Sequence, residues 1–507
     1  MFGVQFHYRN LSPSSKLALV VGFSLCWAAA FCSKGIFHYD EHFQILEFAG
    51  FKLQRVSEDA LAWEFKAFLR PWLQPLIFTS LYQLTDFLAS TQLSTKLFLW
   101  RLLSACLGFS SILVLMGFYL REMPRILQER LLWCLSLFAP LPMLFSRNSS
   151  EMLAAICLNF ATALLLYNGL SATKLRRTKP VIYGVVGFLI GLAFEFRFPS
   201  LVMAAGLLFY FLCVRGIRQS RKPFFWIGLG FLVCLALELW VDYWGYGTLV
   251  FPPYNYFKFN ILQHHVVENI YGTSPFWHYG PLLYYSNIFF PSSLLIATPL
   301  LFWFFFPLHP LTALSLPFCL LHMFLGHKEL RFLFPIFPFF PFFFVMVLER
   351  LSAHWLWLRL HSSKLLVLLL LLSLSRLYTL TFQSLSIDIA VAEYLYDQAP
   401  DKLTLYYTSS EPMIYGGSYV QFYMPKDFKS VKLYSFEEFK HIVQEKPQEA
   451  LVFVRNVDST LKDPFQRLSL PGCRSKIFTR NPLSAAIIDY VPLKKINIRE
   501  ILFCHGL

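Results

Sequence analysis

The sequence is poor in charge: only 15% of its 507 residues are charged, whereas 56% are hydrophobic. A soluble protein of this length carries far more charge on its surface, so the composition excludes a soluble globular class. The sequence also has no CxxC pair, which argues against a zinc site. It shows no internal repeat, whereas transporters of this size often consist of repeated halves.

The hydrophobic residues are arranged in long apolar runs. A helix needs roughly 20 apolar residues to cross the hydrocarbon core of a bilayer. The sequence therefore predicts an all-α polytopic membrane protein with about eleven transmembrane helices. The expected spans are 17–33, 99–119, 131–146, 151–169, 181–196, 200–214, 224–243, 284–306, 309–325, 332–349 and 363–381.

Basic residues determine the expected orientation. The net charge is +14, and Lys and Arg gather in short links between apolar runs, as they do in cytoplasmic loops. The N-terminus is then cytoplasmic, provided that 76–92 is an amphipathic or re-entrant piece rather than a span. Because orientation explains the basic residues, nucleic acid is not an expected partner. The external loops 34–98 and 244–283 are long and hold acids, histidines and aromatics, so chemistry is expected on that face.

The sequence divides into a transmembrane domain, 1–381, and a C-terminal soluble domain, 382–507, on the external side. The C-terminal segment mixes polar stretches with strand-like runs, which predicts a small α/β domain. These runs are Leu403–Thr408, Ala450–Val454 and Ala485–Tyr490. Cys473 and Cys504 form a disulfide if this domain faces an oxidising compartment, or else remain free thiols.

The motif HYDEHFQ, residues 38–44, follows the outer end of the first span. Asp40 and Glu41 open an expected helix, on which Asp40, Gln44 and Glu47 share one face. A partly desolvated carboxyl at a membrane boundary suits a general base. Alternatively, Asp40 caps the helix N-terminus and Glu41 lies in its first turn.

Further charges fall at the external ends of later spans, where ionisable groups are costly and are usually functional or paired. Pairing within the set, of Arg147 with Glu151 and of Arg197 with Glu195, is the alternative to a role in binding. The full set is Arg147, Glu151, Glu195, Arg197, Glu238 and Asp242.

Three external segments are rich in aromatic residues. Residues 61–75 fit an interfacial amphipathic helix, and 242–260 and 268–279 are dense in Tyr, Trp, Asn and Gly. Aromatic faces and amide groups suit sugar binding, but aromatic belts at membrane interfaces have the same composition. The polar candidates in these segments are Glu64, Arg70, Tyr246, Asn255 and Tyr271.

The link GHKELRFLFPIFP, residues 326–338, is short and basic. His327, Lys328 and Arg331 place three potential cations within five residues. A lipid phosphate at headgroup level needs such hydrogen-bond donors. The alternatives are an anchor for anionic lipid and, with less support, metal binding by His327 together with His322.

Taken in order, these motifs resemble those of the Alg9-like mannosyltransferases, glycosyltransferase family 22. HYDEHFQILE is similar to the acidic first-loop motif of that family, and LAWEFKAFLRP to its Trp-Glu…Arg motif. SRNSSEMLAA, EFRFPS, DYWGYG, IYGTSPFWHY and HKELRFLFPIFP resemble further signatures, and the resemblance covers roughly residues 35–340. This chain differs in having Tyr39 where members often have Pro, and Phe65 in place of the second Trp of a Trp-Glu-Trp pattern.

The resemblance implies a GT-C fold and inverting transfer of mannose from dolichyl phosphate or another polyprenyl phosphate. The implied acceptor is a lipid-linked glycan, such as a GPI precursor or a lipid-linked oligosaccharide, and no cofactor or metal is implied. Asp40, with Glu41 beside it, would be the catalytic base, and the residues for the donor phosphate would be His327, Lys328 and Arg331. The residues expected to contact substrate are Gln44, Glu64, Arg70, Arg147, Arg197, Asp242, Tyr246, Asn255 and Tyr271.

The implied location is a membrane, with the active site on the non-cytoplasmic face: the ER membrane of a eukaryote or the inner membrane of a bacterium. Two alternatives stay open. Another GT-C transferase, with a protein, lipid A or polysaccharide acceptor, would also use an acidic first loop. A lipid or sugar flippase or other transporter belongs to a different class, and charges at the external edge rather than along a path weigh against it.

Overall fold

The computed structural model describes most of the chain. The described residues are 11–88, 92–169, 180–263, 279, 292–399, 401–408, 411–415, 417–446, 451–457, 468–471, 473–479 and 498–504. They form two compact units. The helical unit comprises Met1–Ala29, Glu64–Leu76 and Arg101–Thr381, and the mixed unit comprises Ala30–Trp63, Ile77–Trp100 and Phe382–Leu507.

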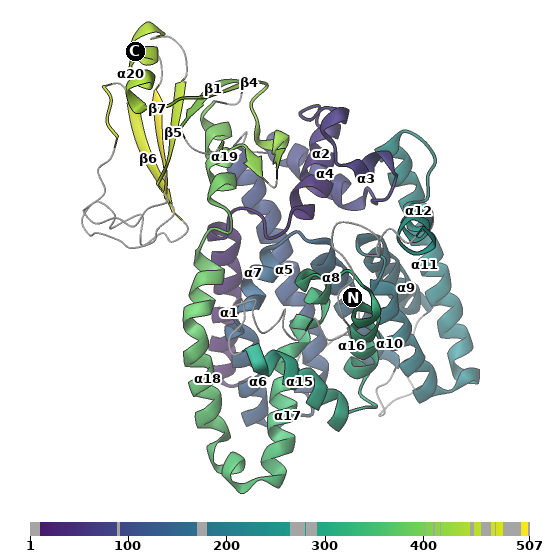
Figure 1. The fold of residues 1–507 in the computed structure, drawn as a ribbon. Coiled ribbons are helices and arrows are strands. Elements are labelled where there is room, and N and C mark those ends of the chain that lie inside the picture. Colours follow the sequence, from purple (N-terminus) through teal and green to yellow (C-terminus); the bar gives the residue numbers. More distant parts are fainter. Residues whose placement is uncertain are drawn as a thin grey trace. The chain divides into compact units, whose positions relative to one another are not determined.

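Long apolar helices make up most of the helical unit (Figure 1). They are α1 (Pro13–Cys32), most of α5 (Leu93–Leu120), α6 (Arg125–Leu137), α8 (Ser150–Gly169), α9 (Pro180–Phe196), α10 (Ser200–Arg215), α11 (Ile217–Tyr246), α15 (Ser292–Phe305), α16 (Pro310–Phe324), α17 (Phe340–His354) and α18 (Leu356–Phe382). Short helices connect them: α3 (Trp63–Lys66), α7 (Pro140–Ser146), α12 (Pro252–Phe257), the π-helix η4 (Lys258–Leu262) and the 3-10 helix η6 (Leu330–Phe339).

The apolar helices have the lengths that membrane spans require. Among the described residues, six helical segments are long and apolar enough to cross a bilayer, and four shorter apolar helices accompany them. The membrane-helix character that the sequence predicts is therefore confirmed. The number of about eleven spans stays a prediction.

Prolines interrupt two of the expected spans. The run 131–146 is divided between α6 and α7, because the chain starts a new helix at Pro140, whose ring nitrogen has no N–H to donate. The run 332–349 opens with the 3-10 helix η6, which contains two prolines, before α17 begins. Hydropathy alone does not reveal such breaks, because proline interrupts the backbone hydrogen bonds without making the run polar.

Close backbone approach joins α9 to α11. A Cβ atom at Gly187 would lie 1.9 Å from the carbonyl oxygen of Ile227, and one at Gly230 would lie 2.0 Å from that of Gly184. These positions therefore require glycine. Small-residue contacts of this kind let membrane helices pack although lipid is as apolar as their side chains.

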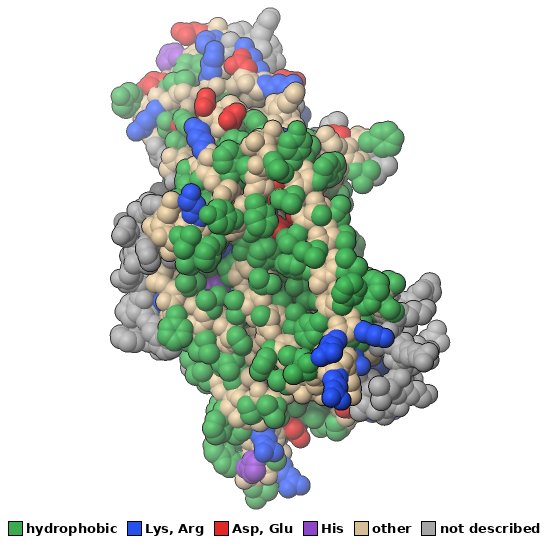
Figure 2. Space-filling model, turned by 90° about the vertical axis from the view of Figure 1, so that its right-hand side faces the viewer, with side chains coloured by type: hydrophobic (Ala, Val, Ile, Leu, Met, Phe, Trp, Pro, Cys, Tyr) green, Lys and Arg blue, Asp and Glu red, His purple; other side chains and the backbone are tan. Residues whose placement is uncertain are grey.

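The helical unit keeps large apolar side chains on its outside. Helix α11 exposes Phe225, Leu232 and Trp240, and Figure 2 shows such side chains over much of one face. Exposed apolar area of this extent marks contact with a membrane or a partner. The exposed Arg218 and Arg221 lie in the first turns of the same helix, and the cytoplasmic side that the sequence predicts for this basic link stays a prediction.

A five-stranded sheet forms the C-terminal part of the mixed unit, with the order β4-β1-β5-β7-β6. Strand β1 pairs in parallel with β4 and β5, whereas β7 pairs antiparallel with β5 and β6. The strands are β1 (Lys402–Tyr407), β4 (Asp427–Lys432), β5 (Leu451–Val457), β6 (Cys473–Thr479) and β7 (Ile498–Cys504), and β2 (Ile414–Tyr415) and β3 (Ser418–Tyr419) form a separate hairpin. The expected runs at 403–408 and 450–454 thus correspond to β1 and β5, whereas Ala485–Tyr490 lies outside the described residues.

Helices complete the mixed unit. Phe439 of α20 (Phe436–Glu445) is fully buried against Phe453 of β5, with the ring centroids 5.0 Å apart. The other helices are the π-helix η2 (His42–Leu46), α2 (Glu47–Lys52), the 3-10 helices η3 (Glu58–Ala60) and η7 (Gln421–Tyr423), α19 (Ile387–Gln398) and the larger part of α4 (Leu73–Leu88). Segment 76–92, which we expect to be amphipathic or re-entrant, is thus helical for most of its length.

Cys473 and Cys504 form a disulfide between β6 and β7. The two residues are opposite each other in the antiparallel register, which brings their side chains together. The other eight cysteines are free thiols. Of the two alternatives that the sequence leaves open, the structure has the disulfide.

We predict that thiol labelling of the denatured, unreduced protein modifies eight cysteines, and that reduction raises the number to ten. The bridged sulfurs have no thiol to react until the bond is reduced. A mass increment per maleimide gives the count. The Cys473→Ser variant should label at nine positions without reduction, because Cys504 is released, and ten labels on the unreduced wild type would contradict the bridge.

Candidate active site

A π-helical turn, His42–Leu46, begins within the HYDEHFQ motif, next to short stretches of α-helix. Such turns are rare and recur at functional sites. Glu41, just before the turn, is buried, and its Oε2 accepts a hydrogen bond from the backbone N–H of Phe37 at 3.1 Å. The backbone N–H of Asp40 donates to Nδ1 of His38 at 3.2 Å. The two acids of the motif therefore have different surroundings.

Asp40 is the more accessible of these acids. Its side chain is 21% exposed, and its Oδ1 lies 3.5 Å from Nδ1 of His38. Its other oxygen, Oδ2, is buried. A general base must reach the proton that it removes, and the partly exposed side chain of Asp40 meets this first requirement better than a buried one does. The buried Glu41 meets it less well, because one of its oxygens already accepts a backbone hydrogen bond.

Glu47 faces His42 rather than joining Asp40. His42 Nε2 and Glu47 Oε1 are 2.6 Å apart, and both side chains are almost fully buried. In a π-helix the backbone bonds run from i to i+5, so residues five apart come together, whereas the α-helical spacing assumed above would place Glu47 beside Gln44. The expected face of Asp40, Gln44 and Glu47 is thus altered by the π-turn.

Two residues of the first external loop, Glu47 and Arg55, bind the backbone of one residue in the C-terminal segment, Phe422. The backbone N–H of Phe422 donates to Glu47 Oε1 at 3.2 Å, and its carbonyl oxygen accepts from Arg55 Nη2 at 2.6 Å. The Arg55 guanidinium also lies 4.1 Å from the centroid of the Tyr396 ring. Because both partners satisfy buried backbone groups, these contacts fix the loop against η7.

The helical unit contains the second group of candidates, in the link 326–338, whose residues from Leu330 onward belong to η6. His327 Nε2 lies 2.6 Å from Glu329 Oε1, and Arg331 Nε donates to Glu329 Oε2. Lys328 Nζ donates to the carbonyl oxygen of Leu325 at 2.5 Å. The three basic residues that the sequence singles out therefore share one short link, in which Glu329 joins two of them.

Glu151 of α8 ties this link to the neighbouring helices. Its Oε1 lies 3.6 Å from Arg331 Nη1 and 3.5 Å from Arg197 Nη2, and the Glu151 side chain is only 2% exposed. An isolated carboxylate at such depth would be strongly destabilised, so two arginines are needed to balance it. Arg197 thus pairs with Glu151, not with Glu195, which the sequence offered as its partner.

Lys328 is the residue of the link whose pKa is shifted by burial. Partial burial lowers the pKa of Lys328 below its ordinary value of 10.5. Arg331 is the second basic group of the link, and a guanidinium is charged at every physiological pH. The link therefore presents positive charge, and desolvation makes that charge more effective toward an anion.

A third cluster joins residues 64–76 to the end of α11. Trp72 N–H donates to Asp242 Oδ1 at 2.9 Å, and Tyr246 OH donates to the carbonyl oxygen of Arg70 at 2.7 Å. A Cβ at Gly245 would lie 2.0 Å from the Trp72 ring, so glycine is required there. The expected substrate contacts Asp242 and Tyr246 therefore also hold the backbone of this segment.

The remaining candidates for substrate contact do not form a single cluster among the described residues. Glu64 Oε1 lies 3.6 Å from Arg70 Nη2, and Asn255 Nδ2 donates to the carbonyl oxygen of Phe68 at 3.2 Å. Gln44 and Arg147 are buried, and Tyr271 lies outside the described residues. Among the residues that the structure describes, no three His, Cys, Asp or Glu gather into a group that could hold a metal ion.

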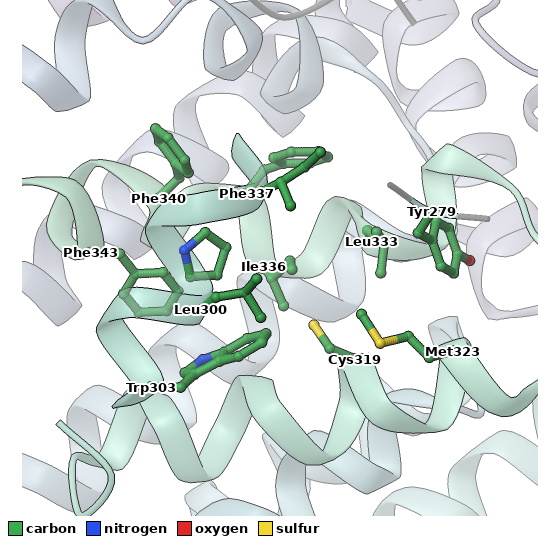
Figure 3. Close-up of a pocket in the computed structure, with 12 residues that line it drawn as sticks. Tyr279, Leu300, Trp303, Cys319, Met323, Leu333, Ile336, Phe337, Phe340 and Phe343 are labelled. Carbon is green, nitrogen blue, oxygen red and sulfur yellow. The ribbon is translucent and has the colours of Figure 1, made fainter. Parts of the chain in front are cut away.

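An apolar cavity of about 710 Å³, including its open mouth, adjoins the basic link. Figure 3 shows Trp303, Cys319 and Phe343 around it, with Tyr279 at one end. Tyr279 OH donates to the carbonyl oxygen of Glu329 at 3.3 Å, and Lys328 Nζ lies 5.9 Å from the centroid of its ring. One tyrosine thus belongs to both the apolar wall and the charged link. The sequence singles out segment 268–279 but gives no sign of this role.

Residues 17–406 of this chain match the model of the Alg9-like mannosyltransferase family. GPI mannosyltransferase 3 of Candida albicans is 28% identical over 338 residues, which cover 64% of this chain and 62% of that protein. GPI alpha-1,2-mannosyltransferase 3 of Homo sapiens is 27% identical over 312 residues, which cover 59% of this chain and 51% of that protein. The matches therefore span less than two thirds of the length of these relatives.

ArnT from Cupriavidus metallidurans is similar in structure. Its crystal structure with bound undecaprenyl phosphate matches with a TM-score of 0.52 at 14% identity, and the match covers 97% of each chain. Its apo structure matches with a TM-score of 0.51. At this identity the likeness shows the fold alone, and it agrees with the GT-C fold that the sequence predicts.

We predict that Glu151→Gln lowers the apparent melting temperature of the purified protein by several degrees. The substitution removes the carboxylate that pairs with Arg197 and one of the two that pair with Arg331, and breaking a buried ion pair costs about 3–5 kcal/mol. Glu437→Gln is the matched control, because Glu437 pairs with Lys440 at an exposed position, where such pairs contribute about 0–1 kcal/mol. Equal melting of the Glu151→Gln variant and the wild type would contradict the network.

Proposed function

We propose that this chain, which belongs to the Alg9-like mannosyltransferase family, transfers mannose from a polyprenyl-phosphate donor to a hydroxyl of a lipid-linked glycan. The observation that carries the proposal is the basic link beside an apolar cavity. A ligand that fits both has a phosphate at one end and a hydrocarbon chain at the other. The chain's similarity to GPI mannosyltransferases supports a GPI precursor as the acceptor.

The donor phosphate binds at Lys328 and Arg331, with His327 beside them. Arg331 is oriented by Glu151 and Glu329, so its guanidinium is positioned before the ligand arrives and costs little to order. The isoprenoid chain enters the cavity past Tyr279. ArnT, whose fold this chain shares, has been crystallised with undecaprenyl phosphate, which supports a lipid phosphate as the ligand class.

Asp40 acts as the general base. It takes the proton of the acceptor hydroxyl while that oxygen forms a bond to the anomeric carbon of mannose. The bond between the anomeric carbon and the phosphate oxygen breaks, and polyprenyl phosphate leaves with the bonding electrons. Lys328 and Arg331 stabilise the charge that develops on the leaving phosphate. Attack from the face opposite the phosphate converts a β-linked donor into an α-mannoside.

The other polar candidates contact the two substrates. Glu64 and Arg70 lie near the Tyr246 and Asn255 contacts of the helical unit, where aromatic faces and amides suit a sugar. Gln44, Arg147, Arg197, Asp242 and Tyr271 complete the proposed set. Arg197 and Asp242 would act mainly through the groups that they hold, because their charged atoms are already engaged.

The reaction takes place on the non-cytoplasmic face of the membrane. The Cys473–Cys504 disulfide supports this side for the mixed unit, because disulfides persist in oxidising compartments. Asp40 belongs to the same unit. The relatives reported above are eukaryotic, which supports the ER membrane as the location.

We expect Asp40→Asn to reduce turnover by on the order of 10²–10⁴-fold, because an amide cannot accept the hydroxyl proton. The test uses purified protein, radiolabelled polyprenyl-phosphate mannose and a lipid-linked acceptor. Asp59→Asn is the control, since Asp59 is an exposed acid of the same unit, and it should keep wild-type turnover. Near-normal turnover of a folded Asp40→Asn variant would remove Asp40 from the mechanism.

Donor affinity should fall as pH rises, and the fall should begin at a lower pH than for an ordinary lysine. The lowered pKa of Lys328 means that its ammonium loses its proton earlier, whereas the phosphodiester stays anionic. The KM for the donor, measured between about pH 8 and pH 10, should therefore rise severalfold. In Lys328→Arg the guanidinium stays charged, so its donor KM should stay flat. Parallel pH profiles of the two proteins would contradict a phosphate contact by Lys328.

A further inference from the structure

Tyr39 is an exposed aromatic residue directly before the proposed base. Its side chain is 49% exposed, and this chain has it where members of the family often have proline. Its ring centroid lies 5.1 Å from that of Tyr415, at an interplanar angle of 57°. Tyr415 belongs to the β2–β3 hairpin of the C-terminal segment, and both residues lie in the mixed unit.

The hairpin presents further groups of the same character. Tyr419, paired with Ile414 across the hairpin, is 43% exposed, and its OH donates to Glu411 Oε2 at 3.2 Å. The hairpin and Glu411, shortly before it in the chain, thus combine aromatic faces with a carboxylate that can accept hydrogen bonds from hydroxyls. Tyrosine supplies a large, rigid and amphipathic contact surface at small entropic cost.

The segment that follows the hairpin is fixed to the same loop. Phe422 is held by Glu47 and Arg55, and the ring of Tyr423 stacks on His42 with the centroids 5.4 Å apart and the planes 12° from parallel. The loop that carries Asp40 and the hairpin that carries Tyr415 are therefore positioned by several contacts besides the tyrosine pair. A rigid surface loses little entropy when it binds a ligand.

We infer that Tyr39 and Tyr415 form a subsite for a sugar ring of the acceptor glycan. The inference rests on the proposed function, because it takes Asp40 as the base. A base lies within hydrogen-bond distance of the hydroxyl that it deprotonates, so residues adjoining it meet the acceptor rather than the lipid end of the donor. The C-terminal segment then takes part in acceptor recognition, and the two rings offer the apolar faces on which a pyranose stacks.

The inference predicts a change in the KM for the acceptor alone. With octyl α-mannoside as the acceptor probe, Tyr39→Ala and Tyr415→Ala should raise its KM at least fivefold, while kcat and the donor KM stay within about twofold. Tyr39→Phe and Tyr415→Phe should behave as the wild type, because they keep the rings. Tyr39→Pro should resemble Tyr39→Ala.

Tyr434→Ala is the matched control, because Tyr434 is 93% exposed elsewhere in the same unit. It should leave every constant unchanged. An unchanged acceptor KM in Tyr39→Ala and Tyr415→Ala would overturn the subsite, and so would a rise in the donor KM instead.

Saturation-transfer NMR of octyl α-mannoside with the same variants separates this inference from the proposed function. The wild type should transfer saturation to the pyranose protons, and Tyr415→Ala should lose most of that transfer. If the wild type binds the probe in this way but turns nothing over, the transferase proposal fails and the sugar subsite stands. Equal saturation in the wild type and Tyr415→Ala would overturn the subsite whatever the activity.

Discussion

The balance of charge around Glu151 is the constraint on which the helical unit's candidate site depends. A carboxylate at 2% exposure within apolar helices is tolerated only because Arg197 and Arg331 approach the same oxygen. Arg331 in turn meets Glu329, which meets His327. The fold thereby orients a basic link at the edge of an apolar cavity, a combination that suits a lipid with an anionic head.

A comparable arrangement positions the proposed base. Glu47 and Arg55 hold the two backbone groups of Phe422, a residue more than three hundred positions away in the chain. The C-terminal segment therefore shares a compact unit with most of the first external loop. This gives the segment a structural part in shaping the surface around Asp40, and it supplies a hydrogen-bond partner for the buried Glu47.

Much of this could be predicted from the sequence, because the signals are local. Apolar runs predict helices, and motifs that are compact in the sequence indicate which residues are candidates for the site. The contacts of Glu47 with His42 and of Arg197 with Glu151 could not be predicted in the same way. The first depends on a π-turn, which changes the residue spacing without a compositional sign. The second joins α8 to the turn between α9 and α10, so it depends on how helices distant in the sequence pack together, and the role of Tyr279 depends on the same tertiary arrangement.

The most direct test is a structure determined with a polyprenyl-phosphate mannose bound. The account predicts the phosphate oxygens within hydrogen-bond distance of Lys328 Nζ or the Arg331 guanidinium, with the isoprenoid chain in the cavity lined by Tyr279, Trp303 and Phe343. A phosphate bound at other basic residues, with that cavity empty of lipid, would contradict it.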